Sequence, residues 1–97
     1  MKDLEFEVKE KVLCYEPDKD KEKILYDATI VEIRKKSDSP GFQYMIHFKE
    51  WSKSFDRWVD KNLLLKVTPE NKKIQRDLFI KIIKENGDRD GFKSVFL

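Results

Sequence analysis

Residues 42–48 alternate strictly between two kinds of side chain. One face of the extended segment carries large apolar groups, which are Phe42, Tyr44, Ile46 and Phe48, and the other carries Gln43, Met45 and His47, with Lys49 just beyond. A period of two is the repeat of a β-strand that turns one face inward. The segment therefore predicts a strand whose aromatic face points into a core, except where that face could open to solvent at its end.

Three more segments have strand character. Lys11–Glu16 is short and mostly apolar, and a charged turn ends it. Ile24–Ile33 is rich in β-branched residues and apolar on both faces, as expected of a strand that curls around a barrel. A turn signal at residues 40–41 joins it to residues 42–48, so the two should pair as an antiparallel hairpin. Residues 57–60 return briefly to strand.

A helix is predicted near the end of the chain. Thr68-Pro69-Glu70 supplies an N-cap, a proline at the first helical position and an acid in the first turn, and Asn86-Gly87 supplies the stop. The apolar residues between them form one stripe, made of Ile74, Leu78, Phe79, Ile82 and Ile83. We expect the helix to pack on the strands by this stripe.

These elements predict one small, mainly β domain. A chain of 97 residues can build only one modest core, and 39% hydrophobic residues are enough to fold it, so the 41% charged residues indicate a solvated exterior. The expected fold is an SH3-like barrel of four to five short antiparallel strands with a C-terminal α-helix. The single domain should span residues 1–97, with strands over about 11–61, a helix over about 69–86 and an irregular tail over 88–97.

The composition argues against several classes of function. Cys14 is the only cysteine and His47 the only histidine, so a disulfide framework or a zinc site cannot be assembled within the chain. His47 has no partner at a catalytic spacing, and no phosphate-binding glycine loop is present, so we expect a non-enzymatic protein without a cofactor, with Cys14 a small buried apolar residue. No segment is long and apolar enough to predict a membrane span. A net charge of +2 does not by itself indicate a polyanionic partner.

The segment that follows the alternating strand is the most specific. Residues 44–59, YMIHFKEWSKSFDRWV, resemble the pattern Y-x-I-H-[FY]-x-G-W-x-x-[SN]-[WY]-D-x-W of chromo-barrel domains. Residues 10–18, EKVLCYEPD, and 24–28, ILYDA, are similar to the male-specific-lethal-3 branch of that family, and the resemblance covers about residues 6 to 80. Two positions depart from it. Glu50 stands where glycine is usual, and Phe55 stands where most relatives carry tryptophan.

The resemblance implies a reader of methylated lysine in the nucleus. The family's aromatic cage maps by motif onto Tyr26, Phe48, Trp51 and Phe55, and Glu16 or Asp27 could add a carboxylate at its rim. Methylation keeps the positive charge of lysine but removes its hydrogen bonds, which favours binding to electron-rich ring faces. The implied partners are a methylated histone tail, with lysine 20 of histone H4 or lysine 36 of histone H3 as candidates, nucleosomal DNA, and the subunits of a histone acetyltransferase or dosage-compensation complex.

Other interpretations remain open. The chain could be a nucleic-acid-binding barrel without methyl-lysine recognition, or a barrel that only docks onto another protein. Trp51 and Phe55 could close the barrel as an apolar plug, whereas Trp58 is expected in the core together with Phe42, Tyr44 and Phe79. The lysines considered for DNA contact, for which a solvated surface is the simpler explanation, are Lys35, Lys36, Lys53, Lys72 and Lys73.

Overall fold

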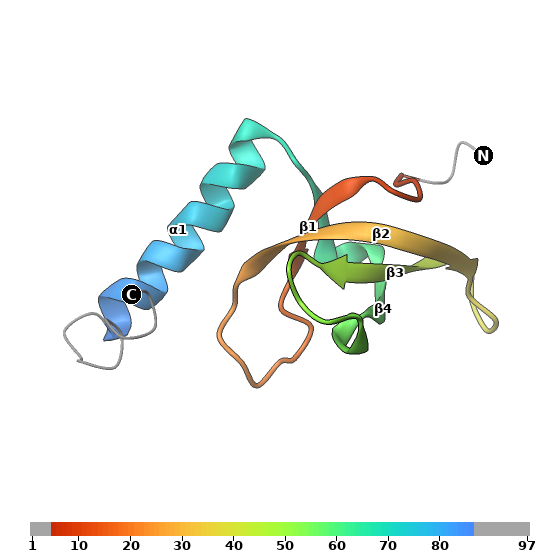
Figure 1. The fold of residues 1–97 in the computed structure, drawn as a ribbon, viewed down its shortest axis with the longest axis horizontal. Coiled ribbons are helices and arrows are strands. Elements are labelled where there is room, and N and C mark those ends of the chain that lie inside the picture. Colours follow the sequence, from red (N-terminus) through yellow and green to blue (C-terminus); the bar gives the residue numbers. More distant parts are fainter. Residues whose placement is uncertain (1–4, 87–97) are drawn as a thin grey trace.

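Five antiparallel strands form one curled sheet in the computed structural model of the chain, which describes residues 5–86. The strands are β1 (Lys11–Tyr15), β2 (Leu25–Lys35), β3 (Phe42–Phe48), β4 (Arg57–Asp60) and β5 (Leu64–Lys66), in the spatial order β4-β3-β2-β1-β5 (Figure 1). Short 3₁₀ helices, Lys53–Phe55 and Lys61–Leu63, precede β4 and β5, and α1 (Pro69–Asn86) follows. The predicted mainly β fold with a C-terminal helix is confirmed, but β5 lies beyond the predicted strand range of about 11–61. The expected tail over 88–97 lies outside the described residues.

The alternation in β3 places its apolar face in the core, as predicted. Tyr44, Ile46 and Phe48 are buried, whereas Phe42 is half-buried and packs against the core from its edge. Phe6 meets the Tyr44 ring edge-on at 5.6 Å between ring centroids. Cys14 is also buried, in agreement with the expectation for this residue.

A β-bulge at Val31 explains why β2 is apolar on both faces. Ile30 pairs with Ile46, but the next pair is Glu32 with Met45, so one residue of β2 is unpaired. An extra residue reverses which side chains point inward. Ile30 is buried before the bulge, Ile33 packs on the core after it, and Val31 is left 44% exposed.

Trp58 lies outside the core, so that part of the core prediction is wrong. β4 pairs Tyr44 with Val59 and Met45 with Trp58, and Val59 is the residue that points inward and is buried. Neighbouring residues in a strand face opposite sides, so Trp58 lies on the outer face. Its ring there stacks on the Arg34 guanidinium at 4.1 Å.

The apolar stripe of α1 packs only in part as expected, because Leu78, Ile82 and Ile83 are half-buried whereas the other two residues of the stripe are exposed. None of residues 69–85 is fully buried, and Ile74 and Phe79 are 39% and 37% exposed, so Phe79 is not a core residue. Figure 1 shows the helix standing away from the sheet. Its half-buried face includes Gln75, whose Nε2 donates to the Leu25 carbonyl at 2.9 Å. The attachment to β2 is therefore partly polar.

Within residues 5–86, no helix combines the length and apolar character that crossing a bilayer requires.

Candidate functional site

Four aromatic rings gather where the end of β3 meets the start of β2. Tyr26 contacts Phe48 and Trp51 at centroid distances of 5.4 and 5.2 Å. Trp51 also contacts Phe48 at 5.0 Å and Phe55 at 5.3 Å. These are the four residues that the sequence predicted as a cage. The structure brings them together around Trp51, the only one that contacts the other three among these ring pairs.

The cluster grades from buried to exposed, as the base and walls of a binding site do. Phe48 is 3% exposed, Trp51 is 40% exposed and Phe55 is 56% exposed. The Tyr26 and Phe55 rings stand at 66° and 82° to the Trp51 ring, so both rise steeply from it. The exposure of Phe55 argues against the plug interpretation, because a plug would be buried.

The loop between β3 and β4, residues 49–56 (the cage loop), turns sharply to present these rings. The backbone N–H of Trp51 donates to the Phe48 carbonyl at 3.1 Å, and Glu50 at the bend has φ +66°. A positive φ is favourable for glycine and costs energy for other residues, which explains why glycine is usual here. The Ser52 side chain accepts from the Ser54 backbone N–H and caps the 3₁₀ turn that ends at Phe55.

Glu16 lies beside the rings, as predicted for the rim. The Tyr26 hydroxyl donates to Glu16 Oε1 at 2.6 Å, and the Asp18 backbone N–H donates to Oε2 at 3.1 Å. Burial, together with the hydrogen bond and charge of Glu16, raises the pKa of Tyr26 above its usual range. The phenol therefore stays protonated and continues to donate.

Asp27, the other predicted rim residue, points elsewhere. Its Oδ1 accepts from Gln75 Nε2 at 3.2 Å and lies 3.5 Å from Lys72 Nζ, both on α1. Partial burial alone would raise the pKa of Asp27, but the contacts with Gln75 and Lys72 outweigh it and hold the pKa below its usual value. Asp27 follows Tyr26 in a strand, and consecutive side chains face opposite sides. Its carboxylate tethers the helix and does not line the rings.

One contact at the site was not predicted. His47 Nδ1 lies 2.7 Å from Asp56 Oδ1, and both side chains are mostly buried, at 29% and 19% exposed. The contact joins the outer side of β3 to the end of the cage loop. The sequence indicated a structural histidine but not its partner.

The matching family model, described as MSL3 chromodomain-like, covers residues 6–79. The chain belongs to the MSL3 chromodomain-like family. It is 43% identical over 83 residues to the human MSL complex subunit 3 and 46% identical over 72 residues to the protein male-specific lethal-3 of Drosophila virilis. These alignments cover 82% and 71% of this chain but only 16% and 13% of the relatives.

A solved structure, the Drosophila MSL3 chromodomain, has the same fold. Its TM-score is 0.75 at 39% identity, over 78% of this chain and 91% of that one. The chromatin modification-related protein eaf3 of Aspergillus fumigatus is 36% identical over 73 residues, which cover 71% of this chain and 20% of that protein. The resemblance to the male-specific-lethal-3 branch is confirmed.

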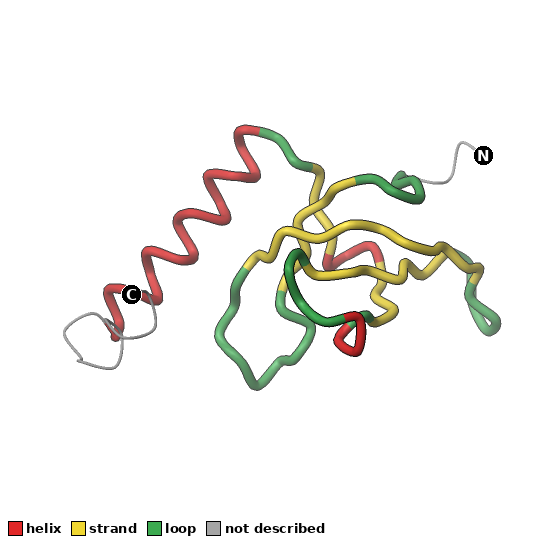
Figure 2. The backbone as a smooth tube through the Cα atoms, viewed as in Figure 1, coloured by secondary structure: helices red, strands yellow, loops and turns green. Residues whose placement is uncertain are grey.

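The lysines that were considered for DNA contact do not form one patch on this MSL3-like domain. Lys35 and Lys36 lie by the β2–β3 turn, Lys53 lies on the 3₁₀ turn of the cage loop, and Lys72 and Lys73 lie on α1. Figure 2 shows the long helix apart from the strands and from the short helical turns. Lys36 is 3.4 Å from Asp60 Oδ1, and Lys73 is 2.9 Å from Asp77 Oδ2, so carboxylates partly neutralise both.

A basic pocket close to the cage loop contains Lys72, one of the lysines considered for DNA contact, and was otherwise missed. Lys11, Lys49 and Lys72 line a hollow of about 350 Å³ beside Asp27 and Thr29. Lys11 pairs with Thr29 across the sheet, which places it on the outer side of the strands. Strand alternation was the sequence signal that could have grouped Lys11 with Lys49.

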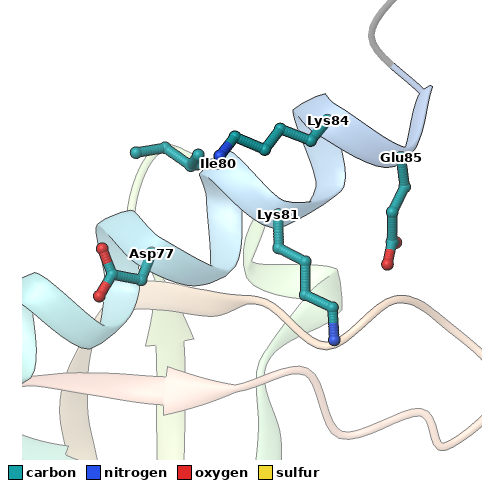
Figure 3. A pocket seen from close by; sticks show the side chains of 5 residues that line it. All are labelled: Asp77, Ile80, Lys81, Lys84 and Glu85. Carbon is teal, nitrogen blue, oxygen red and sulfur yellow. The ribbon is translucent and has the colours of Figure 1, made fainter.

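A second hollow runs along the outer part of α1 and lies apart from the rings. Its lining side chains, Asp77, Ile80, Lys81, Lys84 and Glu85, all come from the helix (Figure 3). Charges of both signs flank Ile80, and within residues 5–86 no strand lines the hollow. This open surface has no feature that selects a ligand.

Proposed function

We propose that this domain is a chromatin reader that binds a methylated histone lysine in an aromatic cage made of Tyr26, Phe48, Trp51 and Phe55. The observation that carries the proposal is the convergence of these rings on Trp51 at centroid distances of 5.0 to 5.3 Å, with two walls exposed. Relatives named as subunits of the MSL complex and as chromatin modification proteins support a nuclear role within a larger complex.

The rings suit a methylated ammonium group. Such a group carries a spread positive charge with few or no N–H donors, and it is attracted to the negative face of an aromatic ring within about 6 Å of the centroid. Trp51 would form the back wall, with Tyr26 and Phe55 at its sides and buried Phe48 as the base. Binding of this kind breaks no bond and uses no cofactor, in keeping with a non-enzymatic role.

Glu16 would add selectivity for the methylation state. One of its oxygens already accepts from Tyr26, which fixes the carboxylate beside the ring. A mono- or dimethylated lysine keeps an N–H that can donate to this carboxylate, whereas a trimethylated lysine has none. We therefore propose a preference for the lower methylation states. Lysine 20 of histone H4 and lysine 36 of histone H3 remain the candidate targets.

Chemical-shift titration with histone peptides in each methylation state tests this function. We expect dissociation constants in the micromolar to millimolar range, because each ring contact contributes about 0.5 to 2 kcal/mol. Trp51→Ala should abolish binding while the barrel stays folded, since Trp51 is 40% exposed. Phe79→Ala is the matched control, because it removes a similarly exposed ring from α1. A Trp51→Ala variant that binds as tightly as the parent would contradict the cage.

Nucleosomal DNA is a second proposed ligand, with an auxiliary role. The supporting observation is the hollow lined by Lys11, Lys49 and Lys72, which lies next to the cage loop and includes its residue Glu50. Phosphate contacts made there would add affinity for nucleosomes without selecting a sequence. If DNA binds but no methylated peptide does, the alternative of a purely nucleic-acid-binding barrel is correct.

A further inference from the structure

Phe55 has little core packing to hold it in place. It is 56% exposed, and its only ring contact within the described chain is with Trp51, at 5.3 Å. Trp51 is itself 40% exposed and comes from the same loop. A binding site needs its side chains held within about 0.5 Å of the productive geometry, so some other contact must fix this loop.

The His47–Asp56 contact is placed to do this. Asp56 directly follows Phe55 and ends the 3₁₀ turn, where its backbone N–H donates to the Lys53 carbonyl at 3.0 Å. Its carboxylate lies 2.7 Å from His47 Nδ1. An ionised carboxylate can only accept, so Nδ1 carries the hydrogen and donates.

The same contact connects the loop to the base of the cage. His47 precedes Phe48 in β3, and consecutive side chains of a strand point to opposite sides. Phe48 forms the buried base on the inner side, while His47 holds Asp56 on the outer side. One strand thus fixes both the base of the cage and, through Asp56, the position of its last wall.

We infer that His47 and Asp56 are positioning residues for ligand recognition, which hold Trp51 and Phe55 in a binding geometry although neither belongs to the ring cluster. The inference rests on the proposed function for its effect on affinity. The two ends of the loop are attached differently. At the start, the backbone N–H of Trp51 donates to the Phe48 carbonyl, and at the end, the Asp56 side chain contacts His47. Loss of the second attachment should leave the loop folded near Phe48 but displaced at Phe55.

The test is a double-mutant cycle on affinity for the best methylated peptide. His47→Ala and Asp56→Ala should each weaken binding about three- to ten-fold, the loss expected when one charge-assisted hydrogen bond no longer fixes the site. The double variant should be no weaker than either single variant, because the two residues act through one contact. Asp56→Asn should restore most of the affinity, since its amide oxygen also accepts from Nδ1.

Gln43→Ala is the matched control. Gln43 lies on the same strand, and its side chain joins Arg34 and Asp60 as His47 joins Asp56, but at the other end of β3. It should leave affinity unchanged. If His47→Ala lowers the melting temperature while the folded protein binds as tightly as the parent, the pair is merely structural and the inference is wrong.

The two tryptophans provide a readout that needs no ligand. Trp51 lies in the cage loop, whereas Trp58 stacks on Arg34 on the outer face of the sheet. In His47→Ala and Asp56→Ala the indole N–H resonance of Trp51 should shift or broaden more than that of Trp58, which lies two residues from Asp56 and senses the loss of the side chain directly. If no peptide binds the parent, the proposed function fails, but these resonances still decide the inference. An unchanged Trp51 resonance in both variants overturns the inference. The inference is also wrong if the losses of affinity in the two single variants multiply in the double variant.

Discussion

The Tyr26 hydroxyl donates a hydrogen bond of 2.6 Å to Glu16 Oε1, and this contact joins the end of β1 to the start of β2 at the rim of the ring cluster. Oε2 accepts from the Asp18 backbone N–H, so both oxygens of the carboxylate are held. A carboxylate fixed in this way can distinguish cations that carry an N–H from those that do not.

Glu16→Gln should therefore reduce the preference of the domain for mono- and dimethyllysine over trimethyllysine. The amide still accepts from Tyr26 but has lost its negative charge, so affinity for the lower states should fall by about 1 kcal/mol more than affinity for trimethyllysine. The ratio of dissociation constants for matched peptides measures this. Asp27→Asn is the control, because that carboxylate faces Gln75 and Lys72. An unchanged ratio in Glu16→Gln would remove Glu16 from the site.

Glu50→Gly should stabilise the fold. At φ +66° a residue with a Cβ costs about 1 to 2 kcal/mol, and the extra chain entropy of glycine offsets about half of this. The expected net gain in the free energy of unfolding is about 0.5 to 1 kcal/mol, measured by urea denaturation. Lys53→Gly, three residues later and without a positive φ, should instead lower stability. A less stable Glu50→Gly variant would show that the Glu50 side chain makes a stabilising contact.

The tether between β2 and α1 should make stability depend on pH through Asp27. The contacts with Gln75 and Lys72 hold the pKa of Asp27 below its usual value despite partial burial. A depressed pKa in the folded state adds stability above the ordinary pKa of about 4, and this is lost as the pH falls through the folded value. Melting temperatures between pH 6 and about pH 2 should fall less steeply in Asp27→Asn than in the parent. If melting temperature falls equally steeply with pH in both proteins, the contacts of Asp27 with α1 do not stabilise the fold.

The proposed DNA contact predicts a particular salt dependence. Replacing Lys11 and Lys49 with glutamine removes two charges from the hollow beside the cage loop. If both contact phosphates, the slope of log affinity for DNA against log salt should become shallower by about 2, since each phosphate contact contributes about 0.9. Replacing Lys35 and Lys36 changes the charge equally at the β2–β3 turn and should have less effect. Equal effects would indicate a diffuse electrostatic field.

Sequence reasoning succeeded where a feature depends on neighbours along the chain. The period of two in β3 predicted which of its residues are buried, and the Thr68-Pro69 and Asn86-Gly87 signals predicted the range of α1. Features that depend on pairing between strands were missed. The bulge at Val31 is visible only in the register between β2 and β3. The outward direction of Trp58 follows from the register of a strand with only four residues.

At the site, too, features set by the local sequence were predicted and features set by contacts between distant segments were missed. Motif matching indicated the four rings, and alternation alone could have separated Tyr26 from Asp27, since consecutive strand residues cannot both face the cage. The His47–Asp56 contact spans the whole cage loop and depends on how that loop folds back onto β3. The stripe of α1 was only partly right, with three of its five residues half-buried, because its spacing describes a helix face but not what covers that face. Here the half-buried face includes the polar Asn71 and Gln75.

Phe55→Trp should tighten binding of methyl-lysine by a few tenths to about 1 kcal/mol. Indole has the most negative and widest face of the aromatic side chains, so it forms a stronger wall for the same cation. Phe55 is 56% exposed and meets the Trp51 ring at 82°, so the larger ring can extend into solvent without overpacking the core. Thermal stability should stay within about 0.5 kcal/mol of the parent, and affinity for the unmodified peptide should not change. Phe79→Trp, a similar change on α1, should leave both affinities as they are. A loss of about 1 to 3 kcal/mol of stability with no gain in affinity is the result expected of a buried plug, and it would remove Phe55 from the binding site.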